Sequence, residues 1–212
     1  MAVVDNLLLK GCRGKVDDLI FYQFRGRTCV RTKPDCGKIT FSVGAIEQQE
    51  RVAGVAALYQ AAKAAGMLRI WQQAAANTRM SGYNLFMQRN VGAFTGEGWI
   101  GDFRKVALSM GTLPLPDRIR LVPGGTDEWM LEWQNVTIYP GANQTDRLVI
   151  ALAGQENGFR VSIPVIGDYR REACRAVLSL PAIQEGYNHL YGWFSNAKGN
   201  RFSKSFYALL SN

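Results

Sequence analysis

The chain has 212 residues, of which 47% are hydrophobic and 20% charged, a composition typical of folded soluble proteins. No apolar run reaches the roughly 20 residues that cross a bilayer, and the N-terminus lacks the basic start and small-residue cleavage site of a secretory signal. We therefore expect a cytoplasmic protein without membrane insertion.

The four cysteines have no CxxC spacing, and the chain contains one histidine. Cysteines and histidines at short, regular spacings mark zinc sites, so this pattern disfavours one. Without a secretory signal, free thiols are expected rather than disulfides. The sequence predicts neither a metal nor a cofactor.

The charge is unevenly distributed along the chain. The net charge is +8, and half of it falls in the first 38 residues, which carry eight Lys and Arg against four Asp. Such a basic segment attracts nucleic acid or an acidic protein surface. It also protects the edge of a β-sheet from pairing wrongly, and both interpretations stay open.

The segment 11–34 is dense in glycine, arginine and lysine, which raises the question of a phosphate-binding loop. A P-loop requires four residues between its glycines and a Ser or Thr after the lysine, ahead of a helix. Here only two residues separate Gly11 from Gly14, Val16 follows Lys15, and a strand-like run comes next. The segment instead predicts short strands and a β-hairpin that turns at Gly26.

Four cations between positions 25 and 33 are separated from one another by even numbers of positions. In one extended strand, Arg25, Arg27, Arg31 and Lys33 would share a face. Arginine is preferred where a phosphate or carboxylate is held by two hydrogen bonds. Together with Lys15, these residues are the predicted partner- or polyanion-binding site, and the alternative is an edge strand protected by charge.

The composition then shifts to Ala, Gln, Glu and Lys. Apolar residues at helical spacing predict an amphipathic helix or helix pair over 43–77, with Ser42 as its cap and an interruption near Gly66. A second short helix is predicted within 80–94. Core packing is favoured over binding to a membrane surface as the role of the apolar face of these helices.

The segment 113–123 carries three of the seven prolines and separates helical from strand-like sequence. We expect it to be a linker between a hairpin plus helical domain at 1–112 and a second domain at 124–212.

The second domain shows a period of two. In EWMLEW, for example, Trp129, Leu131 and Trp133 fall on one face. Similar runs recur between turn-forming stretches without helical interludes, which predicts an antiparallel, fibronectin-like β-sandwich. The predicted fold class is therefore α+β.

No catalytic constellation stands out. His189 lies in an aromatic strand-like run, where a packed residue is more common than a general base. Ser203 and Ser205 lack the Gly-x-Ser-x-Gly elbow. Acidic residues such as Asp146 and Asp168 stand beside turns, which suits turn capping. We expect no enzymatic activity and assign no catalytic residue.

Four motifs follow one another in the order seen in an uncharacterised family. They are GCRGKVDDLIFYQFRGRTCVRTKP at 11–34, GDFRKVALSMGTLPLP at 101–116, NQTDRLVIALAG at 143–154 and LYGWFSNAKGNRFSKSFYALL at 190–210. Together they resemble a domain of unknown function common in Bacteroidota and their mobile elements. The resemblance implies an opening hairpin, a helical middle and a C-terminal sandwich, and it supplies no catalytic residue.

These features predict a non-enzymatic structural or interaction protein. Its expected partners are protein subunits in a homo- or hetero-oligomer. The resemblance adds a phage virion or connector, assembled in the cytoplasm, as a setting. The alternative function is nucleic-acid binding through the basic N-terminal hairpin.

Overall fold

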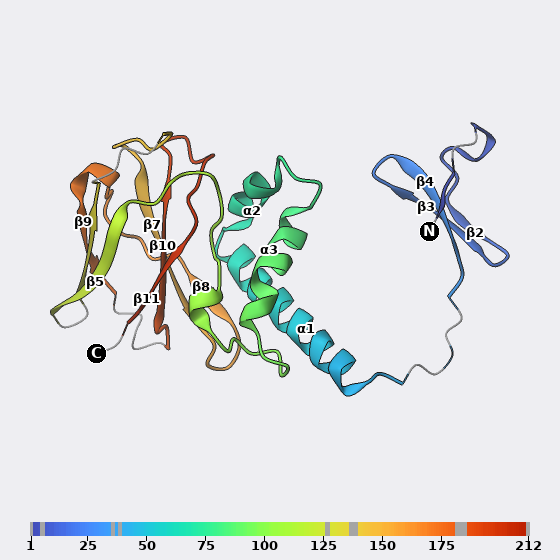
Figure 1. The fold of residues 1–212 in the computed structure, drawn as a ribbon, viewed down its shortest axis with the longest axis horizontal. Helices are drawn as coiled ribbons and strands as arrows, with labels where there is room; N and C mark the ends of the chain where they lie inside the picture. The colour runs from blue at the N-terminus through green and yellow to red at the C-terminus, as the bar shows by residue number, and fades with distance from the viewer. Residues whose placement is uncertain are drawn as a thin grey trace. The chain divides into compact units, whose positions relative to one another are not determined.

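The computed structural model describes residues 2–4, 7–34, 37, 40–125, 128–135, 140–180 and 186–210. The fold is mixed, with three α-helices and antiparallel sheets within this part of the chain (Figure 1). Two compact units make up the protein, Met1–Phe41 and Ser42–Asn212. In the described residues, no helix is both long and apolar enough to cross a membrane.

The boundary between the units differs from the predicted linker at 113–123. Much of that segment lies in strand β5 (Asp117–Gly125) instead. Proline is tolerated in an edge strand or at an irregularity. β5 is an edge strand, and its register shifts between Pro123 and Gly125. Pro123 therefore marks an irregular edge, and Pro114 and Pro116 precede this strand inside the second unit.

The first unit is a four-stranded antiparallel sheet with the order β1-β4-β3-β2. Its two hairpins have two-residue turns, because β2 pairs with β3 and β3 with β4 in direct succession. Arg25 and Gly26 form the second turn with φ values of 50° and 75°, the left-handed pair that such hairpins favour. The predicted hairpin at Gly26 is confirmed. The elements are β1 (Ala2–Val3), η1 (Leu7–Leu9), β2 (Gly14–Val16), β3 (Leu19–Phe24) and β4 (Arg27–Thr32).

The second unit begins with the predicted helices. The Ser42 side chain accepts a hydrogen bond from the Ala45 amide at 3.3 Å and caps the first helix. The expected interruption is at Gly66, whose φ of 86° ends that helix before the next begins. The bounds are α1 (Val43–Ala64), α2 (Leu68–Ala75), α3 (Gly82–Asn90), η2 (Val91–Ala93) and η3 (Phe103–Lys105).

Two antiparallel sheets follow, with the orders β5-β6-β9 and β11-β10-β7-β8. Apart from β5, which falls mostly in the predicted linker, their strands coincide with the period-two runs of the sequence. The remaining bounds are β6 (Glu128–Gln134), β7 (Arg147–Gly154), β8 (Arg160–Ser162), η4 (Arg171–Ala173), β9 (Arg175–Ser179), β10 (His189–Ser195) and β11 (Phe206–Leu209).

The second unit has three layers, with β7 and β10 in the middle one (Figure 1). One face of β7, at Leu148, Ile150 and Leu152, packs with the predicted inward row of β6. The other face, at Ala151 and Ala153, packs under the helices. Because both of its faces are buried, β7 reads as a nearly continuous apolar run.

Candidate interaction surface on the N-terminal sheet

The strand register gives the N-terminal sheet two chemically different faces. Residues directly opposite each other in an antiparallel pair point to the same face. We call the first the neutral face: Ala2, Gly14, Val16, Leu19, Phe21, Gln23, Thr28, Val30 and Thr32. We call the second the basic face: Val3, Lys15, Ile20, Tyr22, Phe24, Arg27, Cys29 and Arg31.

Three of the five predicted site residues are brought together on the basic face. Arg31 and Lys15 both lie opposite Ile20, on either side of β3. Arg27 is opposite Phe24. All three cations are exposed, and none forms an ion pair within 4.0 Å with a carboxylate in the described part of the chain.

The other two predicted residues lie outside the paired strands. Arg25 belongs to the turn, and its guanidinium carbon lies 5.5 Å from the centre of the Phe24 ring. Lys33 follows the end of β4, where its amide donates to the Asp18 carbonyl. The sequence predicted Arg25 in one strand with Arg27, but the chain reverses between them, so Arg25 belongs to the turn.

Sequence reasoning missed two aromatic residues of this face as site residues. Tyr22 and Phe24 alternate on β3 and point to the same side as the cations. The Arg31 guanidinium carbon lies 6.0 Å from the centre of the Tyr22 ring, within reach of a cation–π contact. Pairing the strands across a two-residue turn at Gly26 would have found them.

The neutral face carries no charged side chain among its described strand residues. Part of it is covered, because the Gly11 amide donates to the Thr28 hydroxyl at 3.0 Å and the Gln23 amide group donates to the Cys12 carbonyl. The opposite end is open. There Val16 is 63% exposed and its neighbour Leu19 41% exposed.

This unit has almost no core of its own. Within its described residues, Cys29 is the one apolar side chain that is buried. Seven large apolar side chains are exposed: Val3, Leu8, Leu9, Val16, Leu19, Phe24 and Phe41. Apolar side chains of this unit are therefore exposed on both faces of its sheet.

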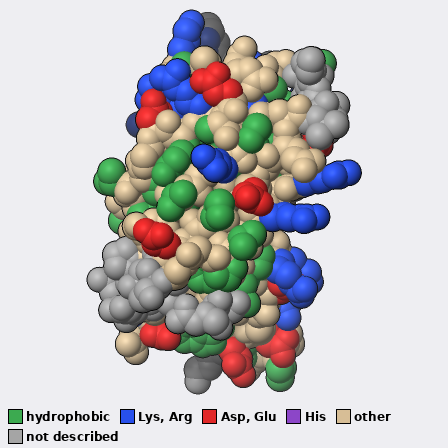
Figure 2. All heavy atoms as spheres, turned by 90° about the vertical axis from the view of Figure 1, so that its left-hand side faces the viewer, with side chains coloured by type: hydrophobic (Ala, Val, Ile, Leu, Met, Phe, Trp, Pro, Cys, Tyr) green, Lys and Arg blue, Asp and Glu red, His purple; other side chains and the backbone are tan. Residues whose placement is uncertain are grey.

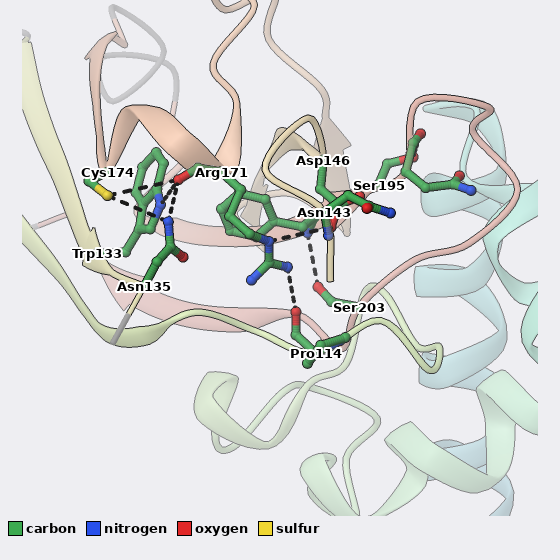
Figure 3. Close-up of polar contacts among 11 residues, drawn as sticks. Pro114, Trp133, Asn135, Asn143, Asp146, Arg171, Cys174, Ser195 and Ser203 are labelled. Atoms are coloured by element: carbon green, nitrogen blue, oxygen red, sulfur yellow. Dashed lines mark hydrogen bonds and ion pairs between the residues drawn. The ribbon is translucent and has the colours of Figure 1, made fainter. Parts of the chain in front are cut away.

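The second unit contains a buried ion pair that is structural (Figure 3). Arg171 Nε and Asp146 Oδ2 are 3.4 Å apart, and both side chains are buried. Arg171 also donates to the Pro114 carbonyl at 2.6 Å and lies over the Phe194 ring. Burial lowers the pKa of this guanidinium, and the Asp146 carboxylate opposes the shift. Asp146 also accepts from the Asn143 amide at 2.9 Å, as its predicted turn role requires. The pair joins two segments that are distant in the sequence, and its Asp146 Oδ1 is buried without a hydrogen-bond partner among the described residues.

The single histidine is also packed into the fold. The His189 ring stacks on Phe103, with 3.4 Å between ring centres, and its Nδ1 lies 3.0 Å from the Tyr207 hydroxyl. Burial lowers the pKa of His189, so the ring is neutral at pH 7. Ser203 bonds backbone groups, since its hydroxyl accepts from the Phe194 amide. The contacts of both residues are those of packed groups.

A hollow of about 400 Å³ lies where β5 and β9 begin and β6 ends. Figure 2 shows the side of the molecule formed by this sheet, where basic, acidic and apolar side chains are mixed. The hollow is lined in part by Arg118, Arg120, Arg175 and the exposed Cys174. Glu132 lies directly opposite both Arg120 and Arg175 in the strand register. This carboxylate balances part of the positive charge, so the hollow is a weaker candidate than the basic face.

No group of three or more potential metal ligands occurs among the residues that the structure describes. Cys12, Cys29 and Cys174 are free thiols, while Cys36 lies outside the described residues. Comparisons with protein-family models, curated proteins and solved structures found no match.

Proposed function

We propose that this protein is a non-enzymatic structural or interaction protein, and that its N-terminal sheet contacts a neighbouring subunit in a larger assembly. The observation that carries the proposal is that, among the described residues of the unit Met1–Phe41, Cys29 alone is a buried apolar side chain. Units of about 40 residues usually need disulfides, a metal or oligomerisation to be stable. Cys12 and Cys29 are free thiols, so these two do not staple the unit. A contact with another protein surface supplies the burial that the unit lacks.

The neutral face is the proposed contact, and a second copy of the chain is its proposed partner. A two-fold contact places the same patch against itself, so a patch with charges of one sign repels its copy. The basic face would bring Lys15, Arg27 and Arg31 against their equivalents. The neutral face has no such cost, and its exposed Val16 and Leu19 bury apolar area on pairing.

The second unit is the proposed rigid body of the subunit. Its three-stranded sheet facing a four-stranded one supports the fibronectin-like sandwich predicted from the sequence. A phage virion or connector, assembled in the cytoplasm, is the proposed setting, and it rests on the family resemblance alone.

Sedimentation velocity of the full chain across a wide concentration range tests the contact. The wild-type protein is expected to show a concentration-dependent dimer or larger oligomer. Leu19→Lys puts a charge on the neutral face and is expected to leave monomers. Phe24→Lys is the matched control, because Phe24 is on the same strand, 52% exposed, and on the basic face. A wild-type monomer at all concentrations, or equal behaviour of the two variants, contradicts the proposal.

A further inference from the structure

The basic face combines positive charge with aromatic rings and has no acidic residue among its described strand residues. Lys15 on β2 and Arg27 and Arg31 on β4 flank the central strand β3. Exposed Lys and Arg side chains of this kind neutralise phosphates of a nucleic-acid backbone. The face is thus positive on both sides of a central strand.

The arginines of β4 are placed to do more than protect a sheet edge. In the order β1-β4-β3-β2, β4 has a neighbour on each side, and β1 pairs with it at Val30 and Cys29. Charge protects a strand from wrong pairing where its backbone groups are unpaired at the edge. The side chains of Arg27 and Arg31 point out of the sheet plane, so they can also contact a ligand that covers this face.

The central strand offers rings to that ligand. Tyr22 and Phe24 are two residues apart on β3, which places them about 7 Å apart along the strand. Phe24 is 52% exposed and Tyr22 is partly buried. Bases of a single strand stack on such aromatic side chains of a sheet, as they do in several RNA- and DNA-binding folds.

We propose that the basic face binds single-stranded nucleic acid, with backbone phosphates on Lys15, Arg27 and Arg31 and bases on Tyr22 and Phe24. A duplex fits less well because its base faces are hidden within the stack. An acidic protein surface would satisfy the cations but would not use the aromatic rings beside them. The inference goes beyond the proposed subunit contact, since that contact uses the opposite face.

Fluorescence anisotropy of the full chain with labelled oligothymidylate and oligouridylate tests the charge component. The logarithm of the binding constant is expected to fall with the logarithm of salt concentration with a slope of about −2, since each neutralised phosphate of a single strand contributes about 0.7. Arg27→Gln/Arg31→Gln should reduce that slope by about 1.4. Lys63→Gln/Arg89→Gln removes the same charge from exposed helix positions of the second unit and should leave the slope unchanged.

A second pair of variants tests the stacking component. Phe24→Leu keeps an apolar side chain and removes the ring, and it should weaken binding about tenfold. Leu19→Ala changes the neutral face, on the opposite side of the same strand, and should leave the affinity for the oligonucleotides unchanged. A labelled duplex of equal length should bind more weakly than either single strand.

Three results would overturn the inference. The first is that neither oligonucleotide binds at low salt, and the second is that the two charge-matched double variants lose equal amounts of the salt slope. The third is tighter binding of polyglutamate than of an oligonucleotide of equal charge. The last result assigns the face to an acidic protein. Sedimentation of the same samples keeps the two proposals apart. A Leu19→Lys monomer that still binds oligonucleotide supports both, and an oligomer that binds none overturns this inference alone.

Discussion

The two compact units of this protein bury apolar side chains in opposite ways. Residues 42–212 contain two apolar clusters that share the middle sheet, with large fully buried side chains such as Trp71, Trp193 and Phe194. In the described part of 2–41, Cys29 alone is buried among apolar side chains. Apolar burial is the main favourable contribution to folding. The second unit therefore has its own source of stability, and the described residues of the first lack a comparable apolar core.

The largest expected effect concerns the buried ion pair of the second unit. Asp146→Asn leaves the buried Arg171 guanidinium without its counter-charge, and removing one partner of such a pair costs about 3–5 kcal/mol. Urea denaturation should show this loss in the free energy of unfolding. Asp168→Asn is the control, because Asp168 pairs with Arg147 and Arg170 at the surface and should cost less than about 1 kcal/mol. Equal costs would mean that the Asp146 pair does not stabilise the core.

A smaller effect is expected where α1 meets the loop before η3. A Cβ at Gly54 would overlap the carbonyl oxygen of Gly98, so Gly54→Ala should lower the free energy of unfolding by about 1–3 kcal/mol. Gly44 lies in the same helix with open space around it. Gly44→Ala should therefore raise stability by roughly 0.5–1 kcal/mol. Thermal unfolding measures both, and two shifts of the same sign would contradict this packing.

The smallest expected effect is the pH dependence caused by His189. Burial lowers its pKa in the folded state, so the unfolded chain takes up this proton at a higher pH than the folded one. Stability is then full above the ordinary histidine pKa of about 6.5 and falls as the pH drops towards the lowered value. His189 is the one histidine of the chain. His189→Gln should therefore reduce the pH dependence of the unfolding midpoint between about pH 7.5 and pH 5, the range in which histidine titrates. An unchanged pH profile in the variant would contradict the prediction.

Local patterns in the sequence predicted much of the fold. Ser42 and Gly66 bounded α1 as expected, and the alternation at Trp129, Leu131 and Trp133 gave the inward face of β6. Such features depend on residues that are near each other in the chain. The expectation of a linker failed because Pro123 fits an irregular edge strand, while Pro114 and Pro116 lie just before that strand within the second unit.

The candidate site was predicted in part. The sequence selected Lys15, Arg27 and Arg31, and the structure places them on one face. It could not separate Arg25 from them, because membership of a strand or a turn depends on the positive φ of two residues. The sequence also could not predict contacts between residues that are far apart in the chain. The pairing of Asp146 with Arg171 arises from tertiary packing of loops 25 positions apart, and no local spacing encodes it.

The alternation of β3 has an evolutionary consequence. Its six residues, Leu19–Phe24, send odd-numbered side chains to the neutral face and even-numbered ones to the basic face. Substitutions can therefore adjust one face while the other is conserved. An insertion or deletion of one residue within the strand exchanges both faces at once. Across related chains, the length between the turns at Asp17–Asp18 and Arg25–Gly26 is expected to stay constant while the side chains of each face vary separately.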